Sequence, residues 1–319
     1  MVSERKDSLN NSLAAINITY NQPILSPGAT WYEQGVVFVN ETVMNSTPMD
    51  LFIDLNNTIY AAVRNKHVIY IFNSENMNAR GNITNGLSKP YSIFLYRDDV
   101  LFIDNGETNK TIDVWSLSNN TRLNSLNISG YCRSLFIDLN ETIYCSMDTT
   151  PIVMKNSFLS FQTSFFEIAA GNGTNGSESH QLHSPKGIFV SKNFSLFVAD
   201  YHNNRIQVFY PNNRTGITLI SDELIVGKRL SHPIDVMLDG YGYVFILDSG
   251  NNRIIGSSSG GWRCVVGCQA LPGLLLPVMN GTRAFAFDSS GHLWVATNDR
   301  ARIQKFHLRS NVSGNTIQQ

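Results

Sequence analysis

The sequence has few charges, few cysteines and no long apolar run. Charged residues make up 15% of its 319 residues and the net charge is −1, so a strongly basic surface for nucleic acid is not expected. The most apolar tract, 270–279, is shorter than the ~18 residues of a membrane helix and contains Pro272 and Pro277. Neither a Gly-x-Ser-x-Gly nucleophile motif nor a glycine-rich phosphate loop is present.

A strand–turn–strand pattern does occur, and it occurs six times. Its clearest copy has apolar runs at 187–190, 196–199 and 206–209, separated by turns rich in Asn, Asp and Ser. The copies are spaced 41, 43, 53, 48 and 49 residues apart when they are aligned on one position. The aligned residues are Val63, Asp104, Met147, Asp200, Asp248 and Thr297. This period and strand chemistry predict an all-β, six-bladed β-propeller with one four-stranded blade per copy.

The two ends of the repeat array are expected to meet. The last copy stops after its third strand, at 306–308, while the apolar segment 35–39 precedes the first copy without a blade of its own. We therefore predict that this N-terminal strand completes the last blade and closes the ring, which removes two unpaired strand edges. The predicted organisation is a polar extension at 1–27, the propeller at 28–308 and a polar tail at 309–319.

The repeats resemble the NHL repeat family. Residues 184–209 and 232–255 follow its pattern of a proline-led first strand, a second strand that ends in Asp, and an Asn-x-Arg-Ile start to the third. Thr297 replaces the Asp in the sixth copy, Val68 replaces the Arg in the first, and the third copy is the most degraded. The resemblance covers about residues 30–308. It implies a six-bladed propeller and no particular activity, because such propellers host unrelated functions.

Signals for N-glycosylation are unusually dense. The sequence holds 16 Asn-x-Ser/Thr sequons, more than its Asn, Ser and Thr content gives by chance, and three of them share the turn between a first and a second strand. We predict a glycoprotein. The predicted sites are Asn40, Asn45, Asn56, Asn82, Asn109, Asn119, Asn127, Asn140, Asn172, Asn193, Asn213 and Asn280. The other four sequons are at Asn10, Asn17, Asn175 and Asn311.

The four cysteines suit two disulfides. Cys132 and Cys145 bracket a predicted hairpin that brings them nearly opposite each other, and Cys264 and Cys268 can bridge locally if Gly267 supplies the tight turn. Zinc is the alternative, but the spacing lacks paired Cys-x-x-Cys motifs. Disulfides and sequons indicate an oxidising, extracellular compartment. Because nothing up to residue 20 forms the apolar core of a signal peptide, we expect a fragment or an ectodomain.

Similar propellers suggest two metal-dependent alternatives. Peptide-amidating lyases resemble this chain and hold zinc with three histidines, typically just after the proline that opens a repeat; Lys186 and Ile234 occupy those positions here. His183 and His232 lie nearby but are only two ligands. Calcium-dependent lactonases need oxygen ligands at the channel mouth, for which Asp200 and Asp248 are candidates. These aspartates also suit hydrogen bonds within their own loops, and we expect that role, with no metal or other cofactor.

Binding of single-stranded RNA is the next alternative, because some NHL propellers use a basic face for it. Residues 1–184 carry an excess of six acidic side chains and 185–319 an excess of five basic ones. Arg205, Arg253 and Arg302 recur at one repeat position and could form a basic stripe, or else brace neighbouring blades with buried stems. We expect the bracing role, and nucleic acid as a partner is not expected.

The sequence therefore predicts a non-catalytic extracellular scaffold that binds a protein, peptide or glycan through loops on a rigid frame. Candidate loops include the insertion 171–179 and the segments that follow the second strands of blades four, five and six. The candidate binding residues are Tyr201, His202, Asn203, Arg205, Asn251, Arg253, Arg300 and Arg302.

Overall fold

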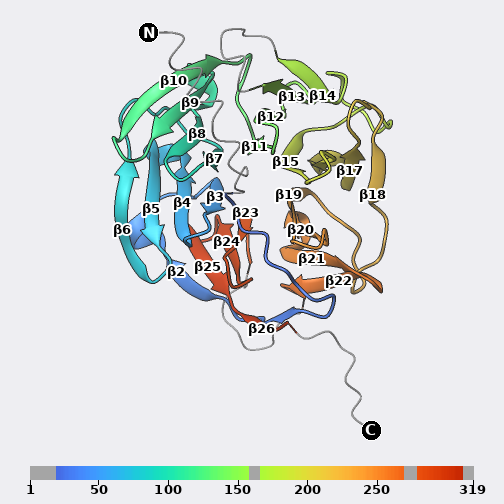
Figure 1. Ribbon diagram of the computed structural model, residues 1–319. Helices are drawn as coiled ribbons and strands as arrows, with labels where there is room; N and C mark the ends of the chain where they lie inside the picture. The colour runs from blue at the N-terminus through green and yellow to red at the C-terminus, as the bar shows by residue number, and fades with distance from the viewer. Residues whose placement is uncertain (1–18, 158–165, 269–278, 312–319) are drawn as a thin grey trace, which may run out of the picture.

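Six four-stranded antiparallel sheets are arranged around a central axis in the computed structural model (Figure 1). The structure describes residues 19–157, 166–268 and 279–311. The sequons at Asn10 and Asn17 and nearly all of the apolar tract 270–279 lie outside the described residues. Within the described ranges, no helix is long and apolar enough to cross a membrane. The prediction of an all-β, six-bladed propeller is confirmed.

Each blade runs from an inner to an outer strand. Blade 1 consists of β3 (Asp50–Ile53), β4 (Thr58–Val63), β5 (Val68–Asn73) and β6 (Asn76–Ile83). Blade 2 consists of β7 (Ile93–Tyr96), β8 (Val100–Asp104), β9 (Thr111–Ser116) and β10 (Thr121–Asn127). Blade 3 consists of β11 (Ser134–Ile137), β12 (Thr142–Met147), β13 (Ile152–Ser157) and β14 (Glu167–Ala170).

The remaining blades follow the same plan. Blade 4 consists of β15 (Pro185–Val190), β16 (Leu196–Asp200), β17 (Arg205–Phe209) and β18 (Ile217–Ile220). Blade 5 consists of β19 (Pro233–Leu238), β20 (Val244–Asp248), β21 (Arg253–Ser258) and β22 (Gly261–Val266). Blade 6 consists of β23 (Thr282–Phe287), β24 (Leu293–Thr297), β25 (Arg302–Phe306) and, from the N-terminal part of the chain, β2 (Val36–Val39).

The repeat register and the ring closure are both as predicted. Each of the six aligned residues, from Val63 to Thr297, is the last residue of the second strand of its blade. These second strands are almost wholly buried because other sheets cover both of their faces. β2 pairs with β25 and completes blade 6, and a further ribbon joins β1 (Thr30–Trp31) to β26 (Leu308–Ser310). The first and last parts of the chain are therefore held together by hydrogen bonds.

Short helical turns follow several second strands, all on one side of the ring. We call this side the upper face. Each blade's first and third strands begin there and run away from it, so the innermost strands also begin on the upper face. The helical turns after second strands are η1 (Arg64–Lys66), α3 (Gly106–Asn109), η3 (Tyr201–Asn203) and η4 (Ser249–Asn251). The helix α2 (Glu41–Met44) follows β2 on the same face and is capped by the side chain of Asn40.

Residues 19–25, within the predicted extension, close the lower end of the central channel. This segment crosses the middle of the ring before it reaches β1 (Figure 1). The ring of Tyr20 lies 5.3–5.9 Å from those of Phe94, Phe136 and Phe189, which come from three blades. Asn21 donates from Nδ2 to the carbonyl of Asp54 at 2.7 Å. Three blades are thus joined under the channel by one aromatic side chain.

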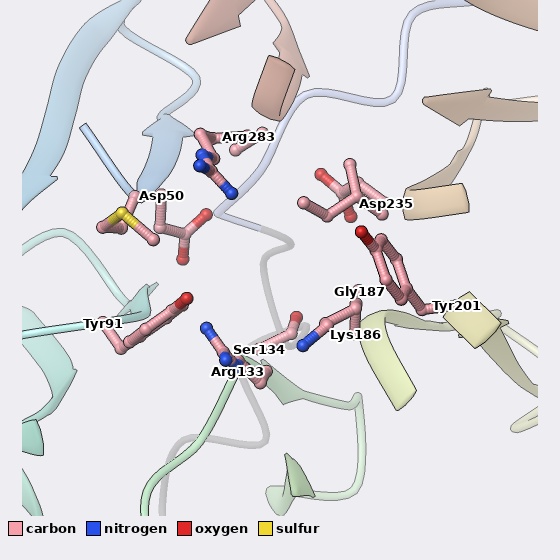
Figure 2. Close-up of a pocket in the computed structure, with 12 residues that line it drawn as sticks. Asp50, Tyr91, Arg133, Ser134, Lys186, Gly187, Tyr201, Asp235 and Arg283 are labelled. Atoms are coloured by element: carbon pink, nitrogen blue, oxygen red, sulfur yellow. The ribbon is translucent and has the colours of Figure 1, made fainter. Parts of the chain in front are cut away.

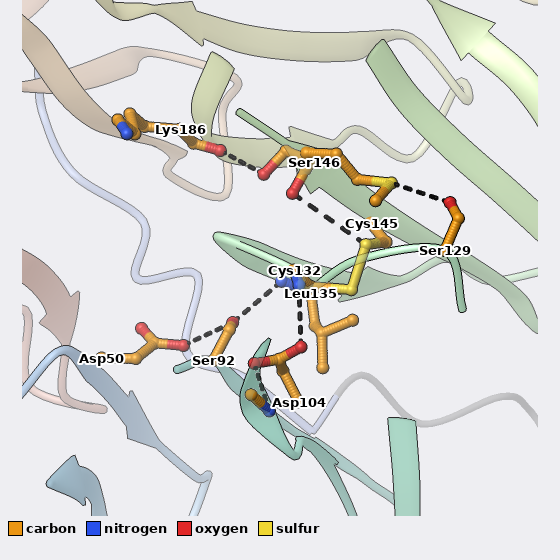
Figure 3. The surroundings of a disulfide bond; sticks show 11 residues. Asp50, Ser92, Asp104, Ser129, Cys132, Leu135, Cys145, Ser146 and Lys186 are labelled. Carbon is orange, nitrogen blue, oxygen red and sulfur yellow. Dashed lines mark hydrogen bonds between the residues drawn. A yellow bond between two sulfur atoms is a disulfide. The ribbon is translucent and has the colours of Figure 1, made fainter. Parts of the chain in front are cut away.

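Both predicted disulfides are present. The Cα atoms are 5.2 Å apart for Cys132–Cys145 and 5.7 Å apart for Cys264–Cys268. Gly267 has a φ of +76°, which is the tight turn expected of it. Cys132 also donates its backbone N–H to Asp104 Oδ1 at 2.7 Å, so blade 2 and blade 3 are joined next to the disulfide (Figure 3).

Candidate functional site

One residue from each blade lines the upper mouth of the central channel. These residues stand at or just before the start of the innermost strand, and together they surround a cavity of about 240 Å³. The six are Met49, Tyr91, Arg133, Lys186, Ile234 and Arg283. Figure 2 shows the two arginines, Lys186 and Tyr91 around a central space. We call these six residues the upper ring; half of them are cationic.

Two of the cations in the upper ring share one carboxylate. Arg133 Nε and Lys186 Nζ lie 2.5 Å and 2.9 Å from the same oxygen of Asp148. Burial lowers the pKa of both Arg133 and Lys186. Burial alone would raise the pKa of Asp148, but the hydrogen bond and charge of Lys186, together with Arg133, hold it below its usual range. The trio thus keeps one net positive charge.

Aromatic rings hold these cations in place. The Arg133 guanidinium lies 4.3 Å from the centre of the Tyr91 ring and 5.2 Å from that of Tyr131. The Lys186 ammonium lies 5.3 Å from the centre of the Tyr201 ring. Such cation–π contacts stabilise a partly buried charge without neutralising it. They therefore keep the positive charge directed at the mouth.

Arg283 is the third cation of the upper ring and is unpaired. Its Nε is buried and has no hydrogen-bond partner, and no carboxylate of the described residues forms an ion pair with it. Its charge also contributes to lowering the pKa of Arg133 and of Lys186. No carboxylate of the described residues offsets the charge of its guanidinium, so a ligand that supplied an anionic acceptor to the terminal nitrogens would gain from the contact.

A second ring of residues, one position further along each inner strand, links the blades. Asp50 accepts the N–H of Ile93 at 2.9 Å, and Ser92 accepts that of Leu135 at 2.9 Å. The same link joins Ser134 to Ile188 at 3.3 Å and, more weakly, Asp235 to Phe285 at 3.4 Å. Each of these side chains therefore satisfies a backbone donor of the next blade. The other two members of this lower ring are Gly187 and Ala284, which carry no acceptor.

The two aspartates of the lower ring compensate for this gap. The N–H that Gly187 cannot reach belongs to Val236, and it is accepted by Asp235 Oδ1 at 2.9 Å. Asp50 Oδ1 likewise accepts the N–H of Leu51 at 2.8 Å, in the blade after Ala284. A carboxylate has enough lone pairs to accept from the next blade and from its own strand at the same time. The serines of the lower ring accept only from the next blade. A Cβ on Gly187 would stand 2.6 Å from the Asp235 Cα, so glycine is needed at that position.

Burial raises the pKa of both aspartates. For Asp50 burial is the dominant cause and outweighs its hydrogen bonds. For Asp235 burial comes first and the nearby charge of Asp50 second, and the pKa rises well above its ordinary value. Raised values favour the protonated, uncharged carboxyl.

An apolar chamber lies below the lower ring. It has a volume of about 70 Å³ and shares Asp50, Ser134 and Asp235 with the mouth, so the two cavities adjoin at these residues. Its floor is Tyr20. The phenyl rings that line it are those of Phe52, Phe94, Phe136 and Phe189, and the equivalent residues of the other two inner strands are Met237 and Ala286.

Two of the arginines predicted at the binding face are buried. Arg205 is 8% exposed and Arg253 is 2% exposed. Their Nε atoms lie 2.7 Å and 2.6 Å from Asp200 and Asp248, respectively, and their other nitrogens donate to carbonyls of the preceding loop. They are internal braces and do not form an exposed basic stripe. The sequence favours this bracing role, although it also places both arginines among the candidate binding residues, because a repeat position looks the same whether it faces solvent or a loop.

The neighbouring candidates divide in the same way. Asn203 and Asn251 donate to Asp200 and Asp248 at 2.8 Å each, so they belong to the braces. Arg302 is also buried and pairs with Asp299, whereas Arg300 is exposed.

Of the predicted binding residues, Tyr201 lines the mouth, and the ring of His202 contacts the ring of Tyr201. Their ring centres are 4.8 Å apart, and the rings of His183 and His232 complete an aromatic cluster around them. Burial, followed by the charges of His183 and His232, lowers the pKa of His202. Within the described ranges, no group of three or more His, Cys, Asp or Glu side chains is placed to hold a metal ion.

The rest of the mouth was missed at the sequence level. In the sequence, the position just after the proline that opens a repeat was considered in two blades alone, at Lys186 and Ile234. Tyr91, Arg133 and Arg283 occupy the same position in three other blades. Comparing that position in all six repeats would have shown three cations. Asp50 and Asp235, one residue later, carry no motif and become visible only when the ring is closed.

All fourteen sequon asparagines within the described residues are exposed, and none of them lines the mouth. Exposure is what attachment of a glycan requires. Glycans at these positions would therefore leave the mouth accessible.

Solved structures similar to this chain are propellers. A streptogramin B lyase has a TM-score of 0.61 at 11% identity, over 88% of this chain and 98% of that one. A Bacteroides thetaiotaomicron protein of unknown function has a TM-score of 0.64 at 15% identity, over 92% and 75%. A Staphylococcus aureus virginiamycin B lyase, in a catalytically inactive form with quinupristin, has a TM-score of 0.58 at 11% identity, over 87% and 99%. At these identities the likeness shows the fold alone.

No protein-family model and no curated protein matches the sequence, so the NHL resemblance stays a prediction. The prediction that the chain is not an enzyme is corrected by the structural comparison. Lyases share this architecture over almost their whole length, and the propeller frame is therefore compatible with catalysis. The sequence argument had relied on the absence of known motifs, which does not exclude a reaction carried out by residues from different blades.

Proposed function

We propose that the protein is an extracellular glycoprotein that binds a small carboxylate ligand in the upper mouth of its central channel. The observation that carries the proposal is the convergence of Arg133, Lys186 and Arg283, from three different blades, on one cavity of about 240 Å³. A pocket that combines a few converging polar groups with aromatic walls is the usual form of a ligand site.

Charge supports an anion as the ligand. Three cations face the mouth, one carboxylate is shared by two of them, and the pKa of each lower-ring aspartate is raised. No carboxylate of the described residues pairs with the Arg283 guanidinium, and a carboxylate ligand would supply that partner. Hydrogen bonds from arginine to a carboxylate are short, strong and often bidentate. Tyr91 and Tyr201 add flat walls on two sides of the space (Figure 2).

Thermal melting with small anions tests this function. Sodium acetate and sodium sulfate, compared at matched ionic strength, are expected to raise the melting temperature in a saturable way. Arg283→Gln should weaken acetate binding about tenfold to a hundredfold, because a hydrogen bond to a charged group contributes about 1.5–3 kcal/mol. Arg214→Gln removes an exposed charge outside the mouth and serves as the matched control. Equal responses of the two variants to acetate would refute the proposal.

Exposed sequons support the extracellular part of the proposal. The fourteen described sequons are exposed and the two disulfides suit an oxidising compartment. In eukaryotic cells, with an added secretion leader, we expect occupied sites that include Asn56, Asn140 and Asn193, which lie in equivalent lower-face turns. Mass spectrometry of glycopeptides measures the occupancy. A protein that is secreted and folded with every sequon empty would contradict this expectation.

A further inference from the structure

The apolar chamber below the lower ring has no role in anion binding by itself. It adjoins the mouth at Asp50, Ser134 and Asp235, which line both cavities. Apart from Asn21 and Tyr20, its other lining residues are aromatic and aliphatic residues of all six inner strands. A space with such a lining holds water poorly and favours an apolar group.

The chamber is also short. Tyr20 forms its floor, and the ring of Tyr20 is fixed by edge-to-face contacts with Phe136 at 5.3 Å and with Phe189 at 5.7 Å. Its volume is about 70 Å³. A cavity needs roughly 10–15 Å³ on this measure to hold one water, so this one accommodates on the order of five non-hydrogen atoms.

We propose that the ligand is a monocarboxylate with a short hydrocarbon tail, whose head lies among the cations of the upper ring and whose tail fills the chamber. The inference rests on the proposed function, since it uses the same cations for the head. The order of residues along the channel sets the orientation: cations lie at the mouth, the buried carboxyls of Asp50 and Asp235 lie below them, and phenyl rings lie at the bottom. A free short-chain acid and the apolar C-terminal residue of a peptide share this chemistry.

Calorimetric titration with acetate, butyrate, hexanoate and octanoate tests the proposal. Each added methylene should tighten binding about fourfold, since burial of one methylene contributes about 0.8 kcal/mol and 1.36 kcal/mol corresponds to tenfold. The gain should stop near hexanoate, where the chamber is full. Hexanol, which has the tail without the head, should bind at least tenfold more weakly than hexanoate.

Two variants locate the tail. Ala286→Leu extends a side chain from β23 into the chamber and should abolish the gain from butyrate to hexanoate while acetate binds as before, which also shows that the variant is folded. Tyr20→Ala removes the floor and should allow octanoate to bind more tightly than hexanoate. A peptide that ends in leucine, with its C-terminus either free or amidated, distinguishes a peptide terminus from a free short-chain acid. If the peptide with a free C-terminus binds tightly and the amidated one does not, the ligand is a peptide terminus.

The outcomes are distinct. Equal affinity for acetate and hexanoate in the wild-type protein would overturn the tail inference and leave anion binding at the mouth intact. No binding of acetate or hexanoate would overturn both proposals. A gain with chain length that persists unchanged in Ala286→Leu would place the tail elsewhere and would overturn the inference as well.

Discussion

Replacing Arg253 with methionine is expected to lower the free energy of unfolding by about 3–5 kcal/mol at pH 8, because it leaves a buried charge without its partner. Arg253 lies 2.6 Å from Asp248 and also donates to the carbonyl of Lys228 at 3.0 Å. Methionine fills much of the space but supplies none of these donors. Asp248 would then be a fully buried carboxylate with no adjacent cation.

Blade 2 already contains such a carboxylate. Asp104 occupies the equivalent position, but its cross-strand partner is Ile112 and not an arginine. Burial raises the pKa of Asp104 to about 8, despite hydrogen bonds from the backbone of Cys132 and Gly106. We expect burial without an arginine partner to act in the same way in blade 5 of the Arg253→Met variant.

The sign of the pH dependence follows. A carboxyl whose pKa is raised on folding binds its proton more tightly in the folded state. Its contribution to stability is complete below about pH 4 and is lost as the pH rises towards the folded pKa. The loss of stability in Arg253→Met should therefore be smaller at pH 4.5 than at pH 8; the part due to the carbonyls that lose a donor is present at both pH values. Urea unfolding at the two pH values measures it.

Blade 1 provides the control. Val63 and Val68 form the same cross-strand pair there and are buried, so an apolar pair is tolerated at this position in the fold. The double variant Asp248→Val/Arg253→Val should be more stable than Arg253→Met at pH 8, because no unpaired charge remains. An Arg253→Met loss that is the same at both pH values, or a double variant that is worse, would contradict this account of the brace.

Removing the disulfide of blade 3 should have the second-largest effect. Cys145→Ala opens a cross-link between residues that are 13 positions apart, and the chain-entropy relation gives a loss of about 3 kcal/mol for a loop of this length. Alanine is used because Cys145 is fully buried, and a serine hydroxyl there would add a desolvation cost. Chemical denaturation under non-reducing conditions measures the change.

The second disulfide is the matched comparison. Cys264–Cys268 spans four positions, so the same relation gives a loss of about 2 kcal/mol for Cys268→Ala. The order of the two losses is the informative result. If Cys145→Ala were no less stable than the wild type under these conditions, the first disulfide would contribute nothing to the folded state.

The propeller could be predicted from sequence because its signals are local and repeated. The last residues of the second strands, from Val63 to Thr297, recur at nearly regular spacing, and the segment 36–39 matches the strand missing from blade 6. The cysteine hairpin could be predicted for the same reason. Each of these inferences needs only neighbouring residues or a count of strands.

The mouth could not be predicted in that way, because the blades differ where it is built. The upper-ring position carries Met49, Tyr91, Arg133, Lys186, Ile234 and Arg283, and these differences are averaged out when the copies are read as one repeat. Asp235 accepts the N–H of Val236 because Gly187, in the preceding blade, has no side chain to do so, and this compensation depends on which blade follows which. Tyr20 carries no repeat signal, so its place as the channel floor was also hidden.

The most direct test is a crystal structure of the protein grown with 4-bromobutyrate, in which anomalous scattering locates the bromine. We predict the bromine in the chamber above Tyr20 and the carboxylate within about 3.2 Å of nitrogen atoms of Arg283 and of Arg133 or Lys186. A carboxylate bound away from these three cations, or a mouth that stays empty while acetate binds in solution, would contradict the assignment of the ligand site.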